Sequence, residues 1–108
     1  MIITICGSMK FAKEMLAAKT LLEEKGHRVF IGPLVKHFAA GKLRYKKGKE
    51  GAKRKVTYNL IKRHFQKIEK SGAILVLNHS KSRCKNYIGG NTLMEMGYAF
   101  YLDKKFIF

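Results

Sequence analysis

The chain has 108 residues, enough for one domain with its own core, and 46% of them are hydrophobic, which excludes a disordered chain. No apolar run reaches the roughly 18 residues of a membrane span, and the N-terminus lacks the basic start of a signal peptide, so we expect a cytoplasmic protein without a membrane segment. Lysine and arginine total 23 against 7 acids, and the resulting net charge of +16 favours partners that carry phosphate.

The first part of the chain alternates between strand and helix patterns. The β-branched run at 1–6 predicts a buried parallel strand, and Gly26 marks the end of the helix that follows. That helix is indicated by apolar residues at helical spacing: Phe11, Met15, Ala18 and Leu22. Residues 28–31 predict a second strand, which closes at Gly32-Pro33.

A basic segment comes next. Residues from about 36 to 55 include three glycines and show no clear period, and we interpret them as a long, mobile, basic loop. Twelve of the 23 lysines and arginines fall between Lys36 and Lys67, where Glu50 is the only acid. Such a segment suits nonspecific contact with nucleic acid, and a solvated basic face without a specific partner fits the charge equally well.

The second part of the chain continues the alternation. An amphipathic helix is indicated by Val56, Leu60, Ile61, His64, Phe65 and Ile68. Residues 73–77 predict a buried strand, 92–102 a third helix, and 105–108 a last strand that we expect to be buried, within the chain or against a partner subunit. This order predicts an α/β fold, a single domain over 1–108 with a parallel sheet and helices on both faces.

Ligands of such folds bind at the carboxyl ends of the strands. The segments expected at that edge are Gly7-Ser8-Met9, Gly32-Pro33 and residues 78–90. Gly7-Ser8 also fits a plain strand-to-helix turn in which Ser8 caps the helix. Cys6 and Cys84 match no metal or redox spacing, so no metal site and no cofactor are expected.

Glu95 admits two interpretations. Thr92-Leu93-Met94-Glu95 has the capping-box pattern, in which Thr92 and Glu95 bond each other's amides at the start of a helix. The other interpretation rests on position. A carboxylate at the ligand-binding edge, near the positive end of a helix, stays ionised and can act as a nucleophile or bind a hydroxyl group. Gly89 and Gly90 would let a ligand approach the backbone closely.

Three segments in the same order resemble one protein family. They are "ITICGSMKF" (3–11), "IEKSGAILVLN" (68–78) and "GGNTLMEMGYAFYLDKK" (89–105), with Glu95-Met96-Gly97-Tyr98-Ala99 as the most specific part. They are similar to the nucleoside 2-deoxyribosyltransferase-like proteins, which include deoxynucleoside 5′-monophosphate N-glycosidases. The resemblance covers nearly the whole chain apart from the basic segment.

The resemblance implies a doubly wound, flavodoxin-like sheet and a deoxynucleoside or deoxynucleotide substrate. It implies that Glu95 attacks the anomeric carbon of a deoxyribose to form a glycosyl-enzyme, which another base or water then resolves. The turn after the first strand would hold a 5′-phosphate, and the loop before Glu95 would contact substrate. The implied substrate-binding residues are Gly7, Ser8, Met9, Lys10, Gly89, Gly90, Asn91 and Thr92. A homo-oligomer, dimer or higher, is implied as well.

The chain departs from the family pattern at several positions. Gly72 stands where the family has an aspartate, Thr4 where it tends to have a tyrosine, and 89–91 where the transferases have further acids. Candidate replacements for the proton donor are His64, His79 and Tyr87, although His64 also fits a packed core position. The departures leave a second hypothesis open, a noncatalytic module that binds a nucleotide or nucleic acid through the same cleft and the basic segment.

Overall fold

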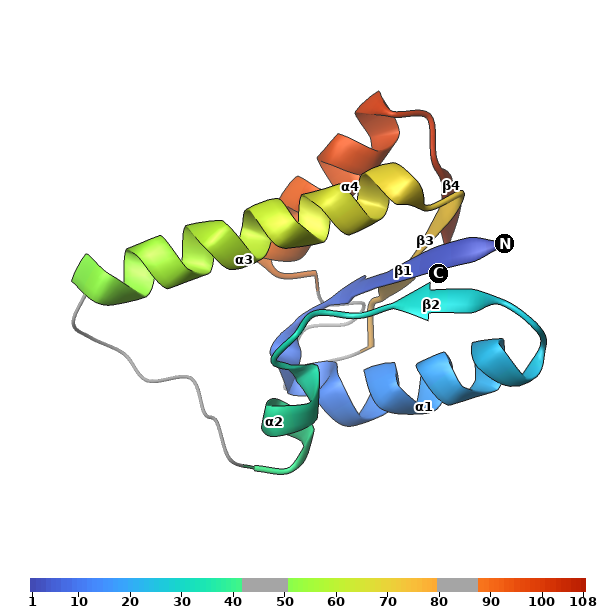
Figure 1. Ribbon diagram of the computed structural model, residues 1–108, viewed down its shortest axis with the longest axis horizontal. Coiled ribbons are helices and arrows are strands. Elements are labelled where there is room, and N and C mark those ends of the chain that lie inside the picture. Colours follow the sequence, from blue (N-terminus) through green and yellow to red (C-terminus); the bar gives the residue numbers. More distant parts are fainter. Residues whose placement is uncertain (42–50, 80–87) are drawn as a thin grey trace.

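The computed structural model describes residues 1–41, 51–79 and 88–108, with residues 51–58 described by their backbone alone. In this part of the chain one parallel sheet has the order β2-β1-β3-β4 (Figure 1). Its strands are β1 (Ile2–Gly7), β2 (Arg28–Phe30), β3 (Ala73–Leu77) and β4 (Lys105–Ile107). The central pair runs from Ile3 opposite Ala73 to Gly7 opposite Leu77, so β1 and β3 end at the same edge.

Helices cover both faces of the sheet. A short 3-10 helix, η1 (Met9–Phe11), leads into α1 (Ala12–Glu24), which lies with α2 (Val35–Ala39) on one face. The other face is covered by α3 (Gly51–Lys70) and α4 (Gly90–Tyr101) (Figure 1). The expected α/β fold with a doubly wound parallel sheet is confirmed, and the strand order is consistent with a flavodoxin-like fold.

The alternation of side chains along β1 divides the core into two layers. Ile5 faces α1 and belongs to a buried cluster with Phe11, Ala12, Met15, Val29, Val35 and Leu77. Cys6, its neighbour, faces the opposite way and packs with Ile68, Ile74, Val76 and Ala99 beneath α3 and α4. A buried β1 therefore connects both layers, and its carboxyl end lies between them.

The expected loop over 36–55 is wrong at both ends. Its first residues belong to α2, where the chain packs Phe38 against the core and turns at Gly41 with φ of 75°. Its last residues belong to α3, which begins at Gly51 rather than near Val56. Residues 52–55 are alanine, lysine and arginine, all strong helix formers, so they extend the helix although they carry no apolar period. Residues 42–50 lie outside the described part.

The last strand is not buried within the chain itself, so its expected burial would require a partner subunit. β4 pairs with β3 alone in the described part of the chain, and Ile107 and Phe108 are 41% and 64% exposed. The apolar residues of this strand are not covered because β4 is at the edge of the sheet, where a strand has a neighbouring strand on one side only. Among the described residues, no helix is both long and apolar enough to cross a membrane.

Candidate functional site

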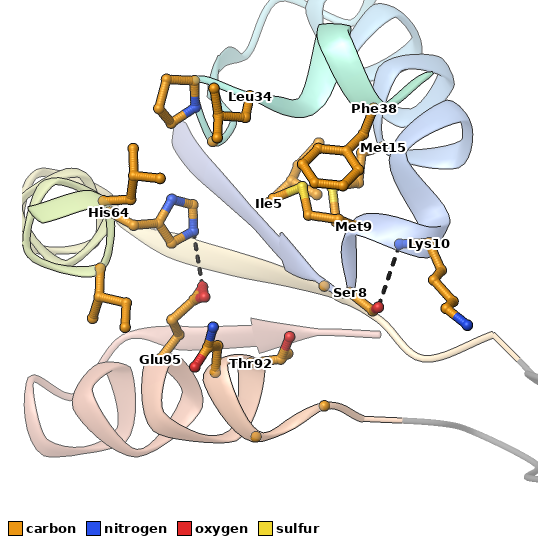
Figure 2. A pocket seen from close by; sticks show the side chains of 18 residues that line it. Ile5, Ser8, Met9, Lys10, Met15, Leu34, Phe38, His64, Thr92 and Glu95 are labelled. Carbon is orange, nitrogen blue, oxygen red and sulfur yellow. Dashed lines mark hydrogen bonds and ion pairs between the residues drawn. The ribbon is translucent and has the colours of Figure 1, made fainter. Parts of the chain in front are cut away.

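A cavity of about 550 Å³ opens at the carboxyl edge of the sheet (Figure 2). Three backbone segments line it: residues 7–10 after β1, 32–34 after β2, and 89–92 at the start of α4. The chain leaves β1 towards one face of the sheet and reaches β3 from the other, so the cavity lies at the topological switch point where α/β folds bind ligands. Every residue that the sequence placed in substrate binding lines this cavity.

Glu95 and His64 meet inside the cavity. Glu95 extends from α4 and His64 from α3, and the carboxylate Oε2 lies 2.9 Å from the imidazole Nε2 (Figure 2). Their side chains are only 13% and 10% exposed. The distance is that of an ion pair, but the contact does not meet the geometry of a hydrogen bond. Glu95 Oε2 has no hydrogen-bond partner among the described residues. The buried Oε2 is therefore held by its ion-pair contact with His64.

The packing of α3 against α4 holds these two side chains together. Phe65, next to His64, stacks on Tyr98 with ring centroids 4.5 Å apart and an interplanar angle of 9°. The Tyr98 hydroxyl donates a hydrogen bond to Glu69, one turn further along α3. This bond to the carboxylate raises the pKa of the Tyr98 phenol. The aromatic pair fixes the rotation of each helix, so His64 and Glu95 face each other.

The capping-box interpretation of Glu95 is wrong. The N-cap of α4 is Gly89, in an extended conformation with φ of −75° and ψ of 166°, and the first intrahelical bond runs from the Leu93 amide to the Gly89 carbonyl. Thr92 therefore lies inside the first turn, where its side chain is buried, instead of preceding the helix. The glycine pair ahead of Thr92 lets the helix begin earlier than the threonine pattern suggested.

Cys6 lies directly beneath this pair. Its Sγ is 3.6 Å from His64 Nε2, and the thiol, the imidazole nitrogen and the carboxylate lie within 4.8 Å of one another. Burial, and secondarily the Glu95 carboxylate, raise the pKa of the Cys6 thiol well above its usual range, so the thiol is protonated. Sequence reasoning missed this cluster, because Cys6 and His64 are 58 positions apart and no local spacing joins them.

The turn after β1 forms the opposite wall. Ser8 is the N-cap of η1, and its hydroxyl oxygen accepts a bond of 3.3 Å from the Lys10 amide. The plain-turn interpretation of Ser8 is therefore confirmed, while its own O–H proton remains available for a ligand. A Cβ at Gly7 would lie 3.0 Å from Met15 Cε and 3.1 Å from Leu77 Cβ, which gives this glycine a packing role. The Lys10 side chain is exposed and extends away from Glu95 (Figure 2).

Of the candidate proton donors, the structure places His64 in the cavity. His79 lies outside the lining and packs edge-on against Phe11, with centroids 5.4 Å apart. Tyr87 lies outside the described residues. Glu95 is the one carboxylate among the described residues that line the cavity.

Comparison with protein-family models gives no match for this chain, and neither does a search of the curated proteins.

Proposed function

We propose that this protein cleaves or transfers the N-glycosidic bond of deoxynucleosides or deoxynucleoside 5′-monophosphates, with Glu95 as the nucleophile. The observation that carries the proposal is the position of Glu95. Its carboxylate lines a cavity at the switch point of the sheet, and its Oε2 atom is 2.9 Å from an imidazole nitrogen without a hydrogen bond in the described structure. The resemblance to the nucleoside 2-deoxyribosyltransferase-like proteins supports the substrate class.

The proposed reaction has two steps. A Glu95 oxygen attacks C1′ of the deoxyribose and forms an ester, while the bond from C1′ to the base nitrogen breaks and its electron pair leaves with the base. Water, or the nitrogen of an acceptor base, then attacks C1′ and releases Glu95 as a carboxylate. The balance requires one proton for the departing base in the first step and removal of one proton from the attacking group in the second.

His64 is the group we assign to holding the Glu95 carboxylate ready for attack, because its ring nitrogen lies 2.9 Å from the Glu95 oxygen. The base leaves C1′ on the side opposite this oxygen, so the proton for the base and the removal of the proton from the attacking water are assigned to solvent in the open cavity. Gly72, where the family has an aspartate, lies beside Met1 and Ile2 at the other end of β3, away from the cavity.

The cavity suits a nucleotide in size and lining. Its volume lies within the roughly 300–1,000 Å³ that small-molecule sites occupy. Gly90 has no atom within 4 Å of where a Cβ would stand, which leaves room for a sugar near Glu95. Leu34 and Phe38 supply an apolar wall on the far side for the base (Figure 2). The Ser8 hydroxyl and the positive field of the chain favour a 5′-phosphate at the turn after β1.

The test is base release by Glu95→Gln. Glutamine keeps the size of the side chain and a contact with His64, so we expect a folded protein that still binds a deoxynucleotide but releases no base, since an amide does not form the glycosyl ester. Glu24→Gln, at an exposed position on α1, is the matched control and should keep full activity. Base release would be followed by chromatography with each deoxynucleoside and deoxynucleotide.

The outcomes separate the two functional hypotheses. Wild-type activity that survives in Glu95→Gln would contradict the nucleophile. Binding of deoxynucleotides by a wild-type protein that releases no base would favour the noncatalytic module instead. His64→Gln should also reduce base release, because the imidazole that holds the Glu95 carboxylate is lost.

A second test addresses the phosphate. We expect a deoxynucleoside 5′-monophosphate to raise the melting temperature more than the matching deoxynucleoside, because the turn at 7–10 and the net charge favour an anion. Ser8→Ala should reduce the difference between the two ligands, whereas Thr20→Ala, an exposed hydroxyl on α1 that bonds the Leu16 carbonyl, should leave it unchanged. Equal stabilisation by both ligands would contradict a phosphate site.

A further inference from the structure

We propose that Cys6, His64 and Glu95 form a three-ligand Zn²⁺ site whose fourth position opens into the cavity. This inference goes beyond the proposed function and does not depend on it. It rests on the three side chains that meet between β1, α3 and α4.

Two of the three distances between donor atoms are close to those of tetrahedral coordination. With Zn–S near 2.3 Å and Zn–N near 2.0–2.1 Å, a tetrahedral angle places sulfur and nitrogen about 3.5 Å apart. Cys6 Sγ and His64 Nε2 are 3.6 Å apart, and all three donor atoms lie within 4.8 Å of one another. The 2.9 Å between His64 Nε2 and Glu95 Oε2 is a few tenths of an ångström shorter than about 3.3 Å, the nitrogen–oxygen edge expected around the metal. We expect a rotation of the Glu95 side chain to bring its oxygen to the distances from nitrogen and sulfur that the ion requires.

The donor set and its surroundings also suit zinc. One thiolate, one imidazole and one carboxylate form a borderline-soft set, which favours Zn²⁺ over Mg²⁺ or Ca²⁺. Glu95 Oε2 is buried without a hydrogen-bond partner in the described structure, and a metal ion would satisfy it. Cys6 is 1% exposed beneath the cavity, while His64 and Glu95 line it, so an ion enters from the cavity and keeps one position for water.

Binding has a definite proton balance. Zn²⁺ displaces the proton of the Cys6 thiol to solvent, and the bound ion then carries a thiolate, a carboxylate and a neutral imidazole. The thiolate and the carboxylate together neutralise the 2+ charge of the ion. The occupied site is therefore neutral, although the chain as a whole carries a net charge of +16. A Glu95 oxygen that coordinates zinc is no longer a free nucleophile, so the metal-bound and glycosyl-transferring states exclude each other.

Cobalt titration tests the site. The protein would carry Cys84→Ser, which removes the only other thiol of the chain, and would be stripped of metal with a chelator before use. We expect Co²⁺ to bind in a 1:1 ratio with a thiolate-to-cobalt charge-transfer band and tetrahedral visible bands, and Zn²⁺ to displace it. Zn²⁺ affinity would be measured by competition with a coloured chelator.

Variants identify the ligands. Cys6→Ser should abolish the charge-transfer band, and His64→Gln and Glu95→Gln should each weaken Zn²⁺ binding by about tenfold or more, since even outer-shell changes cost that much. His37→Gln, an exposed histidine on α2, is the control and should bind as the parent does. Circular dichroism would establish that each variant is folded.

The folded Cys84→Ser protein decides the matter even if a variant fails to fold. Absence of a 1:1 charge-transfer band in that protein overturns the proposal. A band that persists with unchanged affinity in folded His64→Gln and Glu95→Gln overturns it as well. Neither readout involves base release, so the zinc site and the proposed glycosyl chemistry stand or fall separately.

Discussion

Thr4 shows how a buried hydroxyl in β1 is satisfied without taking part in the cavity. Its side chain is fully buried, and its hydroxyl bonds that of Ser71 at the end of α3. Ser71 donates its own proton to the Lys67 carbonyl at 2.8 Å, so Thr4 must be the donor in the bond between the two hydroxyls. Thr4 does not line the cavity, so we assign it no part in the proposed reaction.

We expect Thr4→Val to destabilise the protein. The change removes the donor and leaves Ser71 Oγ with a buried, unsatisfied acceptor position, at a cost of about 1–3 kcal/mol in the free energy of unfolding. Thr4→Ser keeps the hydroxyl and is the comparison that separates the lost hydrogen bond from lost packing. Urea denaturation measures both variants. A Thr4→Val protein as stable as the wild type would show that the hydrogen bond contributes nothing net.

At the scale of elements, Lys67 connects α3 to the end of β2. Its ammonium donates a 2.8 Å hydrogen bond to the Ile31 carbonyl. Burial, and secondarily the charge of Arg63, lower the pKa of Lys67 below 10.5. The charged form is therefore disfavoured in the folded state, and the link between helix and strand carries an electrostatic cost at neutral pH.

This lowered pKa makes a prediction with a definite sign. Below the folded pKa, Lys67 is charged in both the folded and the unfolded chain, so the cost is fully present. As pH rises through that pKa toward 10.5, the folded state loses its proton first and the cost disappears. The melting temperature of the wild type should therefore rise with pH relative to that of Lys67→Met across this window.

Lys62→Met, an exposed position on the same helix, is the matched control and should show no such difference from the wild type. Thermal unfolding at a series of alkaline pH values provides the measurement. The comparison between variants matters because other groups, including the Tyr98 phenol, also titrate at high pH. If the difference in melting temperature between the wild type and Lys67→Met stays constant over the whole alkaline pH range, the prediction is contradicted.

Elements with a strong local pattern could be predicted from the sequence. The apolar run at 73–77 corresponds to β3 at both ends, and the order of strands and helices placed residues 7–9, 32–33 and 89–90 at one edge of the sheet. The capping-box prediction was wrong because the local Thr-x-x-Glu pattern cannot show that the helix already begins after Gly89, three residues before Thr92. The contact between Cys6 and His64 was not predictable, since it depends on the facing of β1 and on the rotation of α3, both fixed by tertiary packing.

At the scale of the whole molecule, charge and apolar surface are separated. The net charge is +16, yet residues 88–103, which include all of α4, contain no lysine or arginine. The same helix exposes large apolar side chains: Leu93 at 62%, Met94 at 51%, Phe100 at 78% and Tyr101 at 80%. Gly97 lies among them with open space around its Cβ position, which permits close approach of another helix. Contiguous apolar surface of this kind is typical of an interface.

A second copy of the chain is the occupant we expect on this face. Two copies of +16 repel each other wherever lysine and arginine dominate, and the α4 face is where that repulsion is weakest. A two-fold axis through this face would bring the same apolar residues together from both copies, as a closed dimer requires. Self-association should also strengthen with salt, because salt screens the remaining repulsion between the copies.

We therefore predict that the wild type is a dimer by light scattering and that Phe100→Lys or Tyr101→Lys makes it monomeric. Both side chains are exposed, so each change should alter the free energy of unfolding by no more than about 0.5 kcal/mol. Leu21→Lys, on α1 and 54% exposed, adds the same charge on the opposite face of the sheet and should leave the dimer intact. A wild type that stays monomeric at high protein concentration and high salt would contradict the prediction. If Leu21→Lys dissociates the dimer equally, the added net charge is the cause of dissociation, and the α4 face is not the interface.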